Sequence, residues 1–354
     1  MKRDSMKRRI ALLTIAALAS ASIMTTQIQA QQNVLNLFNW SEYMDPAILK
    51  DFEKKFKVKV NVSLFESNED MIAKLETSGK GQYDVVVPGQ YAVPILAKKG
   101  LVEKLDKAQI PNLKNLSKKF VNPSYDPGNT YSAAYQWGTV GIVYRKDKVK
   151  NFDPSWSLLF DKAKQQGPFI MMDSTREMLG PALMYLGKSL NTTNKTDLKK
   201  ALEIMTDAKN RSLGFDGGVG GKNKVVASQA NYAVAYNGDA IKATEEDKNV
   251  GYLLPKEGSV IFVDSMAIPA GAKNSKMAHA FINFILEPKI GARLSNYNRY
   301  ATPNEAAKAF IDPKDVKNPA IYPSAAVTAK LEFVLDLAAD NKLYDSIWTK
   351  IKAQ

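Results

Sequence analysis

Short apolar runs alternate with stretches in which apolar residues recur every three or four positions along the first part of the chain. Val34–Trp40 is predicted to be a buried strand, and Asp45-Pro46 then opens a helix with an apolar face. Apolar residues at every second position of Val58–Leu64 predict a second strand. Ser67 caps another helix, and Asp84–Val87 ends at a Pro-Gly turn as a third strand. This order predicts a mostly parallel sheet with helices on both faces.

The same alternation restarts after Trp137 and continues to the C-terminus, without an internal repeat or a low-complexity linker. It predicts an α/β fold with two lobes, joined by strands that cross near residues 138 and 265, and with a cleft between them. The N-terminal lobe is expected over 31–137 and 265–310, and the C-terminal lobe over 138–264 and 311–354. The further predicted strands are Thr139–Tyr144, Phe169–Met172, Tyr232–Tyr236, Gly251–Leu254 and Val260–Pro269, and the predicted helices are Glu177–Leu190, Asp197–Lys209, Lys276–Leu286 and Lys330–Ala353.

The N-terminus has the pattern of a secretory signal. Met1–Arg9 is strongly basic, an apolar run follows, and Ile28-Gln29-Ala30 offers a small residue for cleavage, so residues 1–30 are predicted to be removed after Ala30. The alternative is an uncleaved anchor, but about 15 apolar residues fall short of the roughly 20 that a span requires. The chain has no cysteine, which excludes a lipid-anchoring cysteine and disulfides. We therefore expect a mature protein that is free in a periplasm-like space.

Composition narrows the classes of partner. The 354 residues are 45% hydrophobic, enough for a sizeable core, and the formal net charge is +13. Most lysines lie between apolar positions of predicted helices, as in Lys54-Lys55 and Lys199-Lys200, which is typical of a solvated face. No groove-like run interleaves basic and aromatic residues, so we expect no nucleic-acid partner. No second segment is apolar enough to cross a membrane, and we expect a monomer.

Few residues suit enzyme chemistry. The single histidine, His279, lies among core-type residues of a predicted helix, and without cysteine the usual nucleophiles and zinc sites are hard to assemble. Gly217–Lys222 resembles a phosphate loop, but Asn223 stands where serine or threonine is needed, so this segment is predicted to be a flexible loop. We therefore expect no catalytic activity, cofactor or metal. A secreted enzyme with a carboxylate pair remains an alternative, although no spacing argues for it.

Aromatic and acidic residues gather where predicted strands end, which is where ligands bind in open α/β folds. Each has an ordinary explanation as a core residue or a helix cap. Together they favour one ligand class, because carboxylates attract ammonium groups and aromatic faces hold cations and methylene chains. A slender polycation would use all of them, whereas an amino acid normally needs an arginine for its carboxylate. The clustered residues are Trp40 with Glu42 and Tyr43, Tyr236 with Asp239, Phe262 with Asp264, and singly Tyr91, Glu177 and Tyr300.

Eight short motifs follow one another along the chain: Asn39-Trp40-Ser41-Glu42-Tyr43, Glu66-Ser67-Asn68-Glu69, Asp84-Val85-Val86-Val87-Pro88, Trp137-Gly138, Arg176-Glu177, Pro255-Lys256-Glu257-Gly258, Asp264-Ser265-Met266-Ala267-Ile268-Pro269 and Tyr300-Ala301-Thr302-Pro303-Asn304. In this order they resemble the motifs of bacterial spermidine/putrescine-binding proteins of ABC importers. The likeness covers nearly the whole mature chain and is weakest over residues 205–230 and the last helix. It implies a type II periplasmic binding protein that closes on a polyamine and presents it to an inner-membrane ABC permease.

The resemblance also implies a set of ligand-binding residues. Ser174 stands where spermidine-preferring members have a second carboxylate, and the pattern ending in Asp239 is nearer to putrescine binders. Tyr236 and Phe262 replace frequent tryptophans, Gly89 replaces a common serine, and Val334 stands near a glutamine position. Diamines are therefore expected to bind at least as well as spermidine, although Glu42 could reach a distal amine. The implied residues are Trp40, Ser41, Glu42, Tyr43, Tyr91, Glu177, Tyr236, Asp239, Phe262, Asp264 and Tyr300.

Asp264 is predicted to be the main ammonium anchor, because it interrupts an apolar strand where a charge is costly to bury. The alternative is a hinge aspartate bonded to backbone amides. Three other functions remain open. The first is a receptor of the same fold for another solute, which is an amino acid, an opine or ferric ion. The second is the two-carboxylate enzyme, and the third is a protein that binds partners through its basic surface. The absence of a Tyr-Tyr pair argues against ferric ion.

Overall fold

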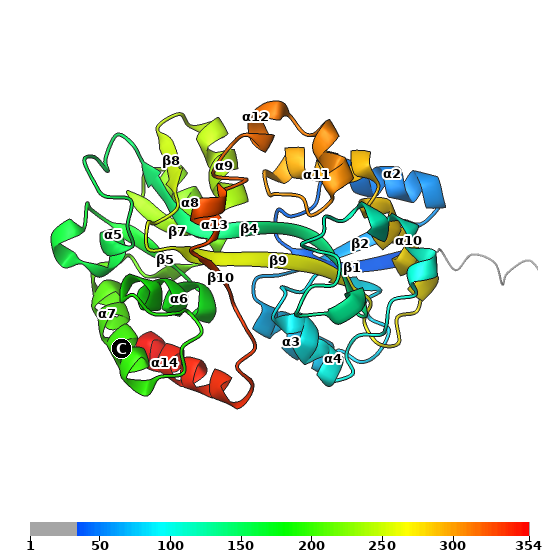
Figure 1. The fold of residues 1–354 in the computed structure, drawn as a ribbon, viewed down its shortest axis with the longest axis horizontal. Helices are drawn as coiled ribbons and strands as arrows, with labels where there is room; N and C mark the ends of the chain where they lie inside the picture. The colour runs from blue at the N-terminus through cyan, green and yellow to red at the C-terminus, as the bar shows by residue number, and fades with distance from the viewer. Residues whose placement is uncertain (1–33, 354) are drawn as a thin grey trace, which may run out of the picture.

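The computed structural model describes residues 34–353, so the predicted signal over residues 1–30 lies outside the described part. Two α/β lobes lie side by side, and two long strands, β4 and β9, run through both (Figure 1). No helix in residues 34–353 combines the length and the apolar character that a membrane crossing needs. The strands are β1 Val34–Trp40, β2 Lys59–Phe65, β3 Val85–Val86, β4 Ser132–Arg145, β5 Phe169–Met172, β6 Phe215–Asp216, β7 Tyr232–Tyr236, β8 Val250–Leu253, β9 Ser259–Ala267 and β10 Leu331–Phe333.

The helices cover the sheet in both lobes. We call β1–β3 with α2–α4, α10 and α11 the N-terminal lobe, and β5–β8 with α5–α9 and α14 the C-terminal lobe (Figure 1). The residue bounds given above for the lobes stay a prediction. The helices are α2 Pro46–Phe56, α3 Asn68–Thr77, α4 Ala92–Lys98, α5 Ser157–Phe160, α6 Thr175–Tyr185, α7 Lys195–Arg211, α8 Gly218–Val226, α9 Asn237–Glu246, α10 Ser275–Ile285, α11 Pro288–Asn298, α12 Pro313–Val316, α13 Ala325–Thr328 and α14 Asn341–Ala353.

The sheet runs in the order β2-β1-β3-β9-β4-β7-β5-β6, with β10 beside β9 and β8 beside β4. The outer strands of each lobe are parallel, as predicted, since β1 pairs with β2 and β3, and β5 with β6 and β7. At the centre β4 and β9 are antiparallel, with Gly138 opposite Phe262 and Gln136 opposite Asp264. These are the predicted crossing strands, and the two-lobed α/β fold class is confirmed.

Local signals start and stop the helices of the N-terminal lobe. The Asp45 carboxylate accepts from the Ala47 amide at 2.8 Å, Pro46 takes the first helical position, and Lys57 ends α2 in the left-handed conformation. Ser67 caps α3 by accepting from the Asp70 amide at 3.1 Å. Cap residues satisfy amides that have no partner inside the helix, so the sequence determines these ends locally.

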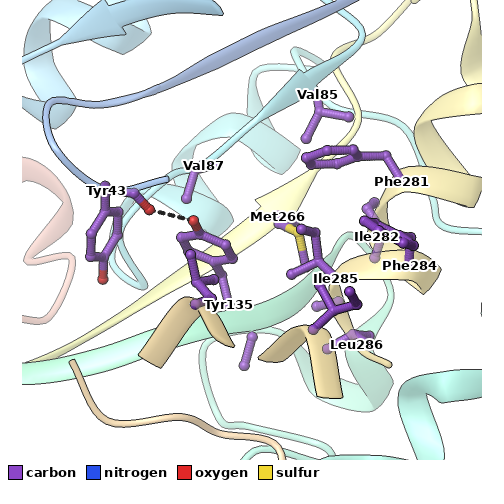
Figure 2. Close-up of a cluster of buried hydrophobic side chains, with 14 of the residues drawn as sticks. Tyr43, Val85, Val87, Tyr135, Met266, Phe281, Ile282, Phe284, Ile285 and Leu286 are labelled. Atoms are coloured by element: carbon purple, nitrogen blue, oxygen red, sulfur yellow. Dashed lines mark hydrogen bonds between the residues drawn. The ribbon is translucent and has the colours of Figure 1, made fainter. Parts of the chain in front are cut away.

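The core of the N-terminal lobe lies between the sheet and α10. Val85 and Met266 of the sheet face Phe281, Ile282 and Ile285 of the helix (Figure 2). Most of these side chains are fully buried, which is where apolar burial contributes most to stability. A separate core in the C-terminal lobe packs α6, α7 and α14 against β5 and β7.

Three sequence predictions of local structure are wrong. Helix α6 begins at Thr175 and ends at Tyr185, because Gly187 takes a positive φ of 70° just beyond it. The segment Lys330–Ala353 was predicted to be one helix, but it begins with β10, which pairs in parallel with β9. The α-helix in this segment is α14, which covers Asn341–Ala353. The predicted loop Gly217–Lys222 is helical from Gly218 onward as the first half of α8, and Gly217 is the N-cap of that helix. At Gly218 a Cβ atom would lie 2.8 Å from the Tyr236 ring, so a glycine allows the helix to approach β7 closely.

Candidate ligand-binding site

A cavity of about 770 Å³, including its open mouth, lies between the two lobes. The carboxyl ends of β1, β3, β5 and β7 meet around it, and β9 passes through its floor. All the predicted site residues except Glu42 line it, and their role in binding stays a prediction. The lining residues are Trp40, Ser41, Tyr43, Glu66, Asn68, Gly89, Gln90, Tyr91, Met172, Asp173, Ser174, Glu177, Gly217, Gly218, Val219, Tyr236, Asp239, Phe262, Asp264 and Tyr300.

Asp264 lies on β9 and is 6% exposed. The Tyr43 hydroxyl donates to its Oδ2 at 2.8 Å. Burial raises the pKa of Asp264 to about 8, the Tyr43 hydrogen bond opposes this rise, and the charge of Glu177 adds to it. The Tyr135 hydroxyl donates to the Tyr43 carbonyl at 2.5 Å and holds the Tyr43 backbone in place (Figure 2). Asp264 is thus a poorly solvated carboxyl whose ionised form is supported by one hydroxyl.

Asp239 lies in the first turn of α9 and is 5% exposed. The Tyr300 hydroxyl donates to its Oδ2 at 2.9 Å. Burial raises the pKa of Asp239 to about 6, although the Tyr300 hydrogen bond and the charges of Lys222 and Lys242 lower it. Its α9 position also exposes it to the helix N-terminus, which favours a negative charge. Asp239 is therefore a second carboxyl of the site that has little access to solvent.

Glu177, in the first turn of α6, is the third buried carboxyl at 8% exposure. It accepts a hydrogen bond from the Ser174 hydroxyl. Burial raises the pKa of Glu177, the Ser174 bond opposes the shift, and the nearby charge of Glu69 increases it. The Tyr91 hydroxyl donates to Glu69 at 2.9 Å, so this part of the cavity is acidic on both lobes.

Aromatic rings connect the three carboxyls. Tyr236 meets Phe262 edge-to-face with ring centroids 5.3 Å apart, and Phe262 lies 6.0 Å from Tyr300. Tyr300 in turn meets Tyr43 at 4.9 Å. Trp40 is fixed at the end of β1 because its Nε1 donates to the Val87 carbonyl at 2.9 Å. The cavity therefore has aromatic walls between its acidic groups.

The charge of the cavity is not balanced from within. Within residues 34–353, no lysine, arginine or histidine forms an ion pair with Asp239, Asp264 or Glu177. Within the described chain no lysine or arginine lines the cavity. No group of three or more acidic or histidine side chains there is arranged to hold a metal ion. A positively charged ligand would supply what the protein does not.

Glu42 is the predicted site residue that does not line the cavity, and its role in binding stays a prediction. Its carboxylate lies 3.8 Å from the ammonium groups of both Lys222 and Lys242. Its backbone φ of 52° lies in the left-handed region, which turns the side chain away from its neighbours Ser41 and Tyr43. Sequence reasoning placed these three residues together because they are consecutive, whereas the local backbone separates them.

Several lining residues were not predicted. Glu66 and Asn68 follow β2, and Asn68 accepts from the Gly89 amide at 2.9 Å. Gln90 is 3% exposed, accepts from the Val263 amide at 3.0 Å and donates to the Val334 carbonyl at 3.3 Å, so it joins the two lobes. The position of Glu66 and Asn68 after a strand was a usable signal. The contribution of the α8 N-terminus was hidden by the assignment of that segment to a loop.

His279 lies away from the cavity. It is 3% exposed on α10, and its Nε2 accepts from the Asp106 amide at 2.9 Å. The prediction that it is a packed helix residue is confirmed.

Comparison with known proteins gives consistent matches. The family described as bacterial extracellular solute-binding protein matches residues 47–324. The Spermidine/putrescine-binding periplasmic protein of Escherichia coli is 34% identical over 96% of this chain and 97% of its own length. The Putrescine-binding periplasmic protein SpuD of Pseudomonas aeruginosa is 38% identical over 96% of this chain and 98% of its own length. A solved structure titled as a putative spermidine/putrescine ABC transporter from Listeria monocytogenes has a TM-score of 0.84 and 35% identity, covering 91% of this chain and 99% of that one.

Proposed function

The chain belongs to the bacterial extracellular solute-binding proteins, and from this premise we propose that it captures a polyamine, putrescine or spermidine, and delivers it to an ABC transporter permease. Relatives named for spermidine or putrescine binding align over nearly the whole chain, which supports this ligand class. The two-lobed fold with an interlobe cavity suits capture followed by release to a membrane partner.

The observation that carries the proposal is the set of three buried carboxyls, Asp239, Asp264 and Glu177, around one aromatic cavity without an ion-pair partner in the described chain. A diamine brings an ammonium group to each end of a methylene chain. Asp264 and Asp239 are proposed to bind ammonium, while the rings of Tyr236 and Phe262 contact the methylene groups. Glu177 extends the acidic surface along the ligand.

The energies suffice for micromolar binding. Each charge-assisted hydrogen bond contributes on the order of 1.5–3 kcal/mol, and each contact of a cation with an aromatic ring about 0.5–2 kcal/mol. Micromolar affinity requires about 8 kcal/mol after the cost of ordering the ligand is subtracted. With two charge-assisted hydrogen bonds at each ammonium group and two ring contacts, the gross energy is about 7–16 kcal/mol, and the upper part of this range leaves about 8 kcal/mol after that cost.

Other ligands fit the cavity less well. An amino acid or an opine carries a carboxylate, and no lysine or arginine lines the cavity within residues 34–353. Ferric ion needs free tyrosine or carboxylate oxygens, but the Tyr43 and Tyr300 hydroxyls already donate to Asp264 and Asp239. An enzyme with a carboxylate pair would need an acid and a base that face the substrate. In this cavity the oxygens of Asp264 and Asp239 accept hydrogen bonds from Tyr43 and Tyr300, and the one histidine, His279, lies away from it.

Export and assembly are part of the same proposal. The signal over residues 1–30 is proposed to direct export and to be removed after Ala30, leaving a periplasmic monomer without cofactor, metal or catalytic activity. N-terminal sequencing of the exported protein tests the cleavage. A mature N-terminus at residue 31 is expected, and a retained signal would contradict it.

Thermal-shift measurements on the mature protein test the ligand class. Putrescine and spermidine are compared with a monoamine, an amino acid, an opine and ferric ion. The two polyamines are expected to raise the Tm, because a ligand at about 100 times its dissociation constant adds roughly 2.7 kcal/mol to the free energy of unfolding. A shift with another ligand and none with either polyamine would overturn the proposal.

A further inference from the structure

Lys222 is a buried lysine that the proposed ligand site does not use. It lies on α8 and is 3% exposed, and its Nζ is 3.8 Å from Glu42 Oε2. Lys242, on α9, lies 3.8 Å from the same oxygen. Two ammonium groups of the C-terminal lobe thus meet one carboxylate from the N-terminal lobe. A buried lysine is uncommon unless it is paired, so this arrangement calls for an explanation.

This cluster of Glu42, Lys222 and Lys242 lies next to the cavity. Ser41 and Tyr43, on either side of Glu42 in the chain, line the cavity, and so does Asp239. The charges of Lys222 and Lys242 lower the pKa of Asp239, and that of Glu42 raises it, which puts all three within electrostatic reach of this carboxyl. The cluster therefore lies close to the part of the cavity that Asp239 lines.

We propose that Lys222, assisted by Lys242, limits the length of the ligand. Its ammonium group already satisfies Glu42 and so takes the place that an additional ligand ammonium would need beyond Asp239. A third amine that reached past Asp239 would meet a fixed positive charge instead of a free carboxylate. The site then favours diamines over longer polyamines. This inference rests on the proposed polyamine function and assigns its length selectivity to a residue outside the ligand contacts.

Calorimetry with putrescine and spermidine on the Lys222→Met variant tests the proposal. Methionine keeps an unbranched side chain of similar length and removes the buried charge, which leaves Glu42 with Lys242 as its remaining ion-pair partner and able to accept a ligand ammonium in place of Lys222. The ratio of spermidine affinity to putrescine affinity is expected to rise about tenfold. In the double variant Glu42→Gln, Lys222→Met, the Glu42 carboxylate is gone and the ratio is expected to return towards that of the parent.

Lys224→Met is the matched control. Lys224 lies on the same helix, is half-exposed and pairs with Asp216 at 2.7 Å, so its replacement removes the same charge away from the cavity. Its affinity ratio is expected to equal that of the parent. Lys222→Arg keeps the charge and is expected to keep the ratio, and Lys222→Gln replaces the methionine variant if the latter does not give a normal melting transition.

An unchanged ratio in Lys222→Met and Lys222→Gln would overturn the proposal. So would an equal gain for both ligands, which would mean that Lys222 only ties the lobes together. If the parent binds neither polyamine, the proposed function itself fails. If it binds both and only the ratio fails to respond, the function stands and the role of Lys222 does not.

Discussion

Replacement of Asp264 by asparagine separates ligand binding from stability. Asparagine keeps the size of the side chain and an oxygen that accepts from the Tyr43 hydroxyl, now 2.8 Å from Asp264. It removes the charge at a site that is 6% exposed. We expect the variant to bind polyamines less tightly and, without ligand at alkaline pH, to be more stable than the parent.

The size of the stability effect follows from the pKa of Asp264, which burial raises from 3.8 to about 8. The pKa of this carboxyl is higher in the folded state than in the unfolded state, so its contribution to stability is complete only below the pKa of the unfolded state. The contribution decreases as the pH rises, and it is lost once the pH passes the folded-state pKa of about 8. At about 1.4 kcal/mol per pKa unit, the loss is on the order of 2 kcal/mol at pH 5 and 5–6 kcal/mol at pH 8.5. Asparagine does not titrate, so the stability of the variant relative to the parent should increase by about 3–4 kcal/mol between these pH values.

The absolute sign depends on how well the new amide is accommodated. A buried amide hydrogen without a partner costs about 1–3 kcal/mol, so the variant is expected to be similar to the parent near pH 5 and clearly more stable near pH 8.5. Loss of one charge-assisted hydrogen bond of about 1.5–3 kcal/mol is expected to weaken polyamine binding by about tenfold to a hundredfold.

Denaturant unfolding of the ligand-free proteins at both pH values measures the first effect, and calorimetry with putrescine measures the second. Asp340→Asn is the matched control, because Asp340 is exposed near the start of α14 and lies outside the cavity. Equal polyamine affinity of Asp264→Asn and the parent would refute Asp264 as an anchor. A stability difference that does not depend on pH would refute the buried, mostly protonated carboxyl.

Three further outcomes follow from the same site. Polyamine affinity should fall as the pH is lowered from about 8.5 to about 5.5, because Asp264 and Asp239, with pKa values of about 8 and about 6, must lose protons to bind ammonium. Calorimetry in buffers of different ionisation enthalpy measures the released protons, and a binding enthalpy that is the same in every buffer would contradict the prediction. Ser174→Asp, which adds a carboxylate beside Glu177, should move the preference towards spermidine in calorimetry, and an unchanged preference would exclude this position as a third-amine site. Binding should also bring the lobes together about β4 and β9, so small-angle scattering should give a smaller radius of gyration with saturating putrescine, whereas an unchanged profile would argue for a rigid pocket.

Features set by neighbouring residues could be predicted from the sequence. The bounds of β1, the Asp45 and Ser67 caps and the apolar strand around Asp264 depend on residues a few positions apart. The aromatic and acidic residues at strand ends also indicated the cavity, because parallel strands bring their carboxyl ends to one edge.

Features set by distant residues could not be predicted in the same way. The Tyr43 hydroxyl reaches Asp264 across 221 positions of sequence, and Glu42 meets Lys222 only because the lobes face each other. The glycines at the start of α8 indicated a loop by propensity, but the close packing of Gly218 against Tyr236 favours the helix. In each case tertiary contacts decided what the local pattern left open.

Calorimetric titration of the mature parent protein with putrescine tests the central claim most directly. One polyamine is expected to bind per chain with a dissociation constant of about micromolar or lower, and the Asp264→Asn variant should bind at least about tenfold more weakly under the same conditions. Absence of binding by both putrescine and spermidine, or binding that the Asp264→Asn change leaves intact, would contradict the account.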